Sequence, residues 1–202
     1  MAVSLAKRGN RSMDHYLDIK LLPDPEFEEQ VLLNALFSKF HRGMSQTVAG
    51  AVGVSFPAVG KRPGGQIRLG GCMRLHGSTE SLDKLMSAGW MKGMRDYTQV
   101  SDIQTVPANC QYRTVRRVQA KSAWNKRKRS IAKGWLTEEE AQAKIPDSQQ
   151  KSMKHVPFLQ IKSLSNGNPM RIYIEHGVLE DEPVTGTFNS YGLSATATIP
   201  WF

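Results

Sequence analysis

The sequence lacks the short patterns that usually mark metal and nucleotide chemistry. It contains only two cysteines, Cys72 and Cys110, which lie far apart and form no CxxC pattern. Its five histidines include no HExxH pair, so no zinc site is predicted. There is no GxxxxGK[ST] loop and no evident acidic cluster for a pair of Mg²⁺ ions. We therefore expect neither a metal nor a cofactor.

Long apolar segments are missing as well. No run approaches the roughly 20 apolar residues that a membrane helix needs. Residues 1–12 lack the apolar centre of a secretory signal, and we interpret them as a short basic arm. With thiols expected to be reduced, these features predict a cytoplasmic protein with no membrane partner.

Acidic residues are absent from residues 103–137, although the chain has 18 Asp and Glu in total. This stretch holds nine of the 27 Lys and Arg, so the basic residues elsewhere balance the acidic ones. The formal charge of +9 is therefore local, which is typical of a surface that binds a phosphate backbone. A solvated basic face without a specific ligand is the alternative.

Six elements are predicted in residues 13–108, in the order strand, helix, strand, strand, helix, strand. Their ranges are 16–21, 25 to about 42, 50–56, 67–75, 80–88 and 99–106. Asp24 is expected to cap the first helix, with Pro25 at its first position. Ser78 and Gly89 bound the second helix. This order is typical of a ferredoxin-like (RRM-like) domain in an α+β protein.

The second half, residues 109–202, has a different order of elements. Thr137 and Glu140 form a capping box for a short helix. The other predicted elements are a strand at 112–119, a helix at 123–133 ended by Gly134, strands near 158–163 and 170–175, and a C-terminal strand.

The helix at 123–133 has two distinct faces. Trp124, Ile131 and Trp135 recur at i, i+7 and i+11, so we expect them to dock the helix on the protein. A different face carries three basic residues that can follow a nucleic-acid groove: Lys126, Arg129 and Lys133.

Without a metal, RNA can still be cut, because its own 2′-hydroxyl can attack the adjacent phosphate. The protein then needs an acid or base with a pKa near neutral, usually His, and groups that hold the hydroxyl in line. His41, near the end of the first predicted helix, is a candidate. A lone histidine there is also typical of a surface or capping residue.

Several segments match a known family in one continuous order from residue 13 to residue 202. They are MDHYLDI at 13–19, PDPEF at 23–27, LF…K…H at 36–41, GVSFP at 53–57, RVQAKS at 117–122, EEEA…IPD at 138–147, YGLS at 191–194 and PWF at 200–202. Together they resemble the repeat-processing endoribonuclease of type I-F (Ypest-subtype) CRISPR systems.

The resemblance implies an activity, a fold and partners. The family cleaves the CRISPR precursor transcript at the base of a repeat hairpin, without metal, by 2′-hydroxyl attack. The products carry a 5′-hydroxyl and a cyclic or 3′-phosphate. One protein keeps each product hairpin and joins other subunits of the surveillance complex. The implied fold is a ferredoxin-like domain, here 13–108, followed by a divergent ferredoxin-like RNA-binding domain, here 109–202.

The resemblance also assigns catalytic roles. His41 falls on the family's catalytic histidine, and Tyr191 on the tyrosine that orients it. Ser163 falls on the serine that holds the nucleophilic 2′-hydroxyl, and Ser165 on a second serine near the cleaved phosphate. Without the resemblance, the two serines would be interpreted as a polar strand edge and Tyr191 as an ordinary core-edge tyrosine.

For RNA binding, Arg117 and Gln119 match the pair that contacts base edges low in the stem, which suits their bidentate chemistry. Arg129 and Lys133 fall on arginines of the family's basic helix, and Lys126 adds charge nearer its start. Met170 stands where the family has a phenylalanine that stacks under the terminal base pair, and it lacks an aromatic face.

Two further basic positions of the family's helix are Ser130 and Gly134 here. A subunit that binds repeat RNA without cutting it is the principal alternative. A general RRM-like RNA chaperone would explain the charge and the element order but leaves the YGLS and PWF segments unexplained.

Overall fold

The computed structural model describes residues 13–119, 122–149, 153–162 and 167–202. Within these residues the chain forms a mixed α+β structure with several antiparallel sheets, so the predicted α+β class is confirmed. No helix in the described part of the chain is long and apolar enough to cross a membrane.

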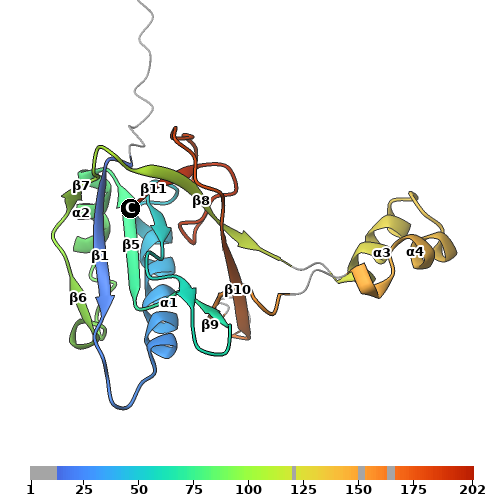
Figure 1. The fold of residues 1–202 in the computed structure, drawn as a ribbon, viewed down its shortest axis with the longest axis horizontal. Coiled ribbons are helices and arrows are strands. Elements are labelled where there is room, and N and C mark those ends of the chain that lie inside the picture. Colours follow the sequence, from blue (N-terminus) through green and yellow to red (C-terminus); the bar gives the residue numbers. More distant parts are fainter. Residues whose placement is uncertain (1–12, 120–121, 150–152, 163–166) are drawn as a thin grey trace, which may run out of the picture.

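The first half forms an antiparallel sheet in the order β2-β5-β1-β6, and β7 also pairs with β1 (Figure 1). Two helices connect these strands, and a small hairpin of β3 and β4 precedes β5. The bounds are β1 His15–Leu21, α1 Glu29–Thr47, β2 Gly53–Ser55, β3 Gly60–Lys61, β4 Ile67–Arg68, β5 Cys72–Gly77, α2 Thr79–Ser87, a 3₁₀ turn at Arg95–Tyr97, β6 Thr98–Val100 and β7 Gln104–Thr105.

The second half forms another antiparallel sheet, in the order β11-β8-β10-β9. Both of its α-helices lie between β8 and β9 in the chain, and Figure 1 draws them projecting away from the sheets. The bounds are β8 Gln111–Val118, α3 Ala123–Ala132, α4 Glu138–Lys144, a 3₁₀ turn at Asp147–Gln149, β9 Phe158–Lys162, β10 Pro169–His176 and β11 Thr198–Trp201.

Several predicted boundaries in the first half are wrong. The strand predicted at 50–56 is reduced to β2, and the strand predicted at 99–106 is split into β6 and β7, which pair with different parts of β1. Helix α1 begins at Glu29 and not at Pro25, because the Asp24 carboxylate closes a separate turn by accepting from the backbone N–H groups of Glu26 and Phe27 at 2.9 Å each. The predicted strand 67–75 is split into β4 and β5. The chain at Gly70 lies against the backbone of Ala58 so closely that no Cβ would fit, which interrupts the strand.

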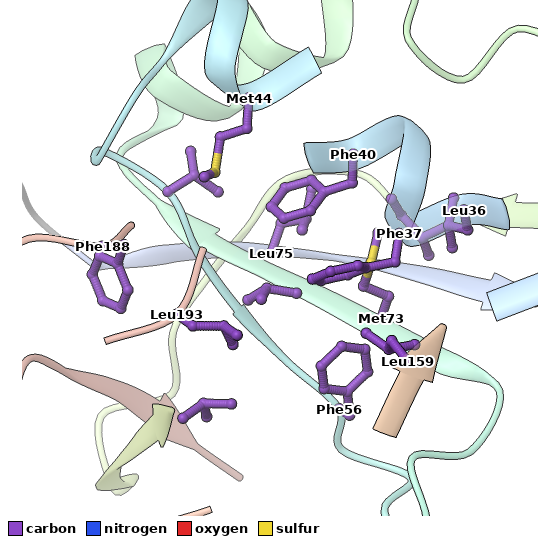
Figure 2. Close-up of a cluster of buried hydrophobic side chains, with 14 of the residues drawn as sticks. Leu36, Phe37, Phe40, Met44, Phe56, Met73, Leu75, Leu159, Phe188 and Leu193 are labelled. Atoms are coloured by element: carbon purple, nitrogen blue, oxygen red, sulfur yellow. The ribbon is translucent and has the colours of Figure 1, made fainter. Parts of the chain in front are cut away.

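The two sheets share one hydrophobic core. Figure 2 shows Phe37 and Phe40 of α1 beside Leu75 of β5, with Leu159 of β9 and Leu193 completing the cluster. All five side chains are fully or almost fully buried. Burial of this kind is the main source of stability, so the relative position of α1 and the second sheet is fixed by packing.

Hydrogen bonds also connect the first half of the chain to the second half. The backbone N–H of Val54 in β2 donates to the Gly192 carbonyl at 2.9 Å. The Asn34 side-chain oxygen on α1 accepts from the backbone N–H of Gln160 in β9, also at 2.9 Å. Residues far apart in sequence are therefore held together along α1.

Candidate active site

His41 lies on α1 where the apolar face of that helix ends. The neighbouring residues Phe40 and Met44 are buried, whereas His41 is only partly buried. The helix therefore fixes the backbone of His41 and leaves its ring at the protein surface.

The ring of His41 has a defined hydrogen bond. Its Nδ1 lies 2.6 Å from the backbone carbonyl oxygen of Ser190. A carbonyl only accepts, so Nδ1 carries the hydrogen and donates it. In the neutral ring the lone pair is then on Nε2, which can take a proton, and the protonated ring can return one from the same atom.

The Ser190 carbonyl belongs to a tight turn at residues 189–193. The Asn189 side-chain oxygen accepts from the backbone N–H groups of Tyr191 at 2.8 Å and of Leu193 at 3.2 Å. The Gly192 N–H donates to the Asn189 carbonyl, and the Gly192 carbonyl accepts from Val54. The turn is thus tied both to itself and to β2, which makes it a rigid support for His41.

Tyr191 places its ring against His41. The two ring centroids are 4.2 Å apart with an angle of 17° between the planes, which is a stacked arrangement. Tyr191 also lies parallel to Phe37, with centroids 6.3 Å apart. The imidazole therefore has its position set by one hydrogen bond and one aromatic face.

Arg117 joins the same cluster from β8. Its guanidinium carbon lies 5.6 Å from the centre of the Tyr191 ring, and its Nη2 is 3.5 Å from the sulfur of Met170 on β10. Its Nε is buried without a hydrogen-bond partner. The guanidinium is therefore held at the site by its contacts with Tyr191 and Met170.

A groove of about 510 Å³, partly open to solvent, is lined by His41. Its other lining residues come from α1, from β9 and from Gly167 and Pro169. Besides His41, the polar and charged lining residues are Asn34, Ser38, Arg42, Gln160 and Lys162.

The basic helix α3 forms as predicted, with Ser122 as its N-cap. Lys126, Arg129 and Lys133 are exposed, as a surface for phosphates requires. Arg127 is used differently, because it donates to the Ile145 carbonyl at 2.7 Å and to Asp147 at 2.9 Å.

The expected docking of α3 through its apolar residues is wrong. Trp124 is 58% exposed, Trp135 is 65% exposed and Ile131 is 38% exposed. The helix instead packs on α4, where Ala123 and Ala141 are buried. Trp135 lies beyond the end of α3 at Ala132, and apolar spacing could not show whether any surface covers these side chains.

The structure brings together four of the predicted site residues: His41, Tyr191, Arg117 and Met170. Gln119 is exposed near the end of β8 and has no contact with this cluster that the structure shows. Ser163 and Ser165 lie outside the described residues. Lys162 and Gly167, the nearest described residues on either side of that segment, both line the groove beside His41.

Sequence reasoning missed two parts of the site. The Ser190 carbonyl has no side-chain signature, although Asn189 before the YGL segment is a typical turn-forming residue. The groove residues Arg42 and Lys162 were also missed, because they come from elements that only the fold brings together.

Another histidine, His76, forms a side-chain pair with a serine in the core. Ser55 Oγ lies 2.8 Å from His76 Nε2, and both side chains are fully buried. Burial, followed by the charge of Arg74, lowers the pKa of His76 to about 3. This pair has no access to a substrate and is structural. Among the described residues, no three His, Cys, Asp or Glu side chains gather as metal ligands would.

The fold and the histidine cluster define an α+β protein with an oriented histidine at its surface and a separate basic helix that projects from the second sheet (Figure 1). The family model for CRISPR-associated protein Csy4 matches residues 16–202. A CRISPR-associated endonuclease Cas6/Csy4 of Escherichia coli (strain UTI89 / UPEC) is 48% identical over 191 residues, which are 94% of this chain and 100% of that protein. A protein of the same description from Pseudomonas aeruginosa (strain UCBPP-PA14) is 40% identical over the same shares of both chains.

The chain therefore belongs to the Cas6/Csy4 family of CRISPR-associated endonucleases. The resemblance inferred from the sequence motifs is confirmed.

Proposed function

We propose that this chain is a CRISPR endonuclease that binds the hairpin of the CRISPR repeat and cuts the precursor RNA at the base of the stem. The observation that carries the proposal is the arrangement of His41, whose ring is held by the Ser190 carbonyl and stacked on Tyr191. An acid–base group needs this orientation to meet a reacting hydroxyl in line.

In the proposed reaction, the 2′-oxygen of the nucleotide before the cut attacks the adjacent phosphorus. The 2′-hydroxyl loses its proton, the bond from phosphorus to the 5′-oxygen breaks, and that oxygen gains a proton. His41 Nε2 exchanges one of these two protons. The products are a 2′,3′-cyclic phosphate, which can open to a 3′-phosphate, and a 5′-hydroxyl. No step requires a metal.

Ser163 is proposed to hold the attacking hydroxyl and Ser165 to contact the region of the cleaved phosphate. These roles come from the family resemblance, since both serines lie outside the described residues. Lys162 and Gly167 lining the groove next to His41 support them, because the serines follow Lys162 directly in the chain.

The RNA stem is proposed to lie across Arg117, Gln119 and α3. Arg117 suits a guanine edge and Gln119 an adenine edge. A-form major grooves are normally too narrow for side chains, so contact is proposed near the open end of the stem. Exposed Lys126, Arg129 and Lys133 contact phosphates, and Met170, which touches Arg117, covers the terminal base pair.

We further propose the domain division expected from the sequence. Residues 13–108 form a ferredoxin-like domain, which the strand order β2-β5-β1-β6 with two connecting helices supports. Residues 109–202 form a divergent RNA-binding domain, and residues 1–12 a basic arm. One protein binds each hairpin in the cytoplasm, keeps the product and joins the other subunits of a surveillance complex.

One experiment tests the chemistry. The protein is mixed, in excess EDTA, with a repeat hairpin and with the same RNA carrying a single 2′-deoxynucleotide just before the cut. We expect the all-ribose RNA to be cut to a fragment with a 5′-hydroxyl, and the deoxy RNA to bind equally well and stay intact. Cleavage of the deoxy RNA, or cleavage only after Mg²⁺ is added, would refute the mechanism. Tight binding of both RNAs without any cleavage would favour the binding-only alternative.

A further inference from the structure

The groove beside His41 extends past the groups that the proposed chemistry uses and has features of a binding site for more of the RNA. Its volume of about 510 Å³ lies in the range of about 300–1,000 Å³ found for ligand sites. It is partly open to solvent, which suits a chain that passes through better than an enclosed small molecule.

The walls of this groove are fixed. Asn34 on α1 accepts from the backbone N–H of Gln160 at 2.9 Å and from the side chain of Gln30 at 3.1 Å. Gln30 also donates to the Phe158 carbonyl at 3.3 Å. Helix α1 and strand β9 are therefore linked at the groove, and a ligand would meet a preformed surface.

The charge of the groove is positive. Arg42 and Lys162 line it from opposite walls and both are exposed. None of the described lining residues is Asp or Glu. Two cations on opposite walls with no acidic neighbour suit a phosphodiester backbone, as lysine and arginine do in other single-strand grooves.

The position of the groove sets which part of the RNA can reach it. His41 stacks on Tyr191, and Tyr191 contacts Arg117, which in turn contacts Met170. Arg117 and Met170 are the residues proposed to contact the stem. His41 also lines the groove. An RNA strand that leaves the stem and presents its phosphate to His41 continues past the histidine into the groove.

We propose that this groove binds the RNA strand on the 3′ side of the cut, with Arg42 and Lys162 contacting its backbone phosphates. The inference rests on the proposed function, because it places the cleaved phosphate at His41. The groove then positions the departing strand so that the 5′-oxygen stays in line with the attacking hydroxyl.

The test compares two RNAs that share the repeat hairpin. The short RNA ends one nucleotide after the cut, and the long RNA continues for several unpaired nucleotides. Both carry the 2′-deoxynucleotide for affinity measurements and an all-ribose form for single-turnover cleavage. The protein variants are Arg42→Gln with Lys162→Gln, and Lys84→Gln as the matched control, because Lys84 is an exposed lysine on α2 outside the groove.

We expect the wild-type protein to bind the long RNA more tightly than the short one. The double variant should lose roughly tenfold affinity for the long RNA and much less for the short RNA, with a shallower salt dependence only for the long RNA. The control variant should match the wild type with both.

If the double variant lost the same affinity for the short RNA as for the long RNA, the inference would be overturned, since Arg42 and Lys162 would then act on the hairpin itself. Equal affinity of the wild type for both lengths would overturn it as well. In either case cleavage by the wild type would leave the proposed function standing. If the wild type cuts neither all-ribose RNA, the proposed function fails, and this inference fails with it.

Discussion

Gly192 is the residue on which the support of His41 depends most sharply. Its φ is +71°, in the left-handed region, and it lies in the turn that presents the Ser190 carbonyl. A Cβ at this position would lie 3.1 Å from both Phe40 Cζ and Val54 Cγ1, which are core atoms with no room to move. Replacing Gly192 by Ala therefore combines backbone strain with crowding in the core.

The loss in the free energy of unfolding caused by Gly192→Ala can be estimated from these two effects. The left-handed conformation costs an Ala about 1 kcal/mol, and crowding of a packed core costs about 1–3 kcal/mol more. The sum of about 2–4 kcal/mol corresponds to a fall in Tm of roughly 5–15 °C for a chain of this size. We expect Gly192→Ala also to slow cleavage, because the turn and the Ser190 carbonyl must shift.

Gly89→Ala is the matched control. Gly89 has a φ of +67° but no heavy atom within 4 Å of an added Cβ, so only the backbone cost of about 1 kcal/mol applies. Thermal and urea unfolding of the two variants measure the difference. Equal destabilisation would refute the packing argument, and an unaltered cleavage rate in a destabilised Gly192→Ala protein would refute the role of the turn.

Three other predictions concern stability. Trp135→Ser should change the free energy of unfolding by less than about 0.5 kcal/mol, because the side chain is 65% exposed; a larger loss in urea unfolding would show that it is covered. Arg74→Met should lower the free energy of unfolding by about 3 kcal/mol in the same assay. It leaves the largely buried Asp18 carboxylate, now 2.6 Å from Arg74 Nε, without a positively charged partner; an unchanged free energy of unfolding would contradict this. Burial lowers the pKa of His76 to about 3 and of His176 to about 4, so as pH falls below about 6.5 the unfolded chain takes up protons that the folded chain does not. The free energy of unfolding should then fall by about 1.4 kcal/mol per pH unit for each histidine. His176→Gln removes one of the two contributions, so it should halve the combined slope between about pH 6.5 and pH 5.

The elements with clear local signals were predictable from the sequence. Ser78 caps α2, Ser122 caps α3, and the Thr137–Glu140 capping box begins α4, as their spacing indicated. Asp24 showed the same kind of signal but closes a turn, because caps and turns use the same hydrogen bonds. Local chemistry located the ends of most elements and could not separate these two uses.

The site was predictable only in part. His41 could be proposed from the chemistry of RNA cleavage, and the resemblance added Tyr191 and Arg117, which the structure places with it. The Ser190 carbonyl and the pairing of Arg42 with Lys162 depend on packing between α1 and the second sheet. Contacts of this type join distant parts of the chain and leave no periodic pattern in the sequence.

The exposed apolar side chains of α3 show that spacing alone does not predict burial. Apolar spacing predicted docking, yet Trp124 is exposed and has the Lys128 ammonium 5.1 Å from its ring centre. Helical periodicity identifies residues that share a face, but burial also requires a partner surface, which α4 supplies on a different side.

The most direct test of the account is cleavage of a CRISPR repeat hairpin by the wild type and by His41→Ala, in excess EDTA, with hairpin affinity measured in parallel. His15→Ala is the control, because His15 is paired with Asp14 at the start of β1 and belongs to no part of the proposed site. We predict that His41→Ala binds the hairpin about as well as the wild type and cleaves about 10²- to 10⁴-fold more slowly, while His15→Ala does both normally. Cleavage at the wild-type rate by His41→Ala would contradict the assignment of His41 as the acid–base group.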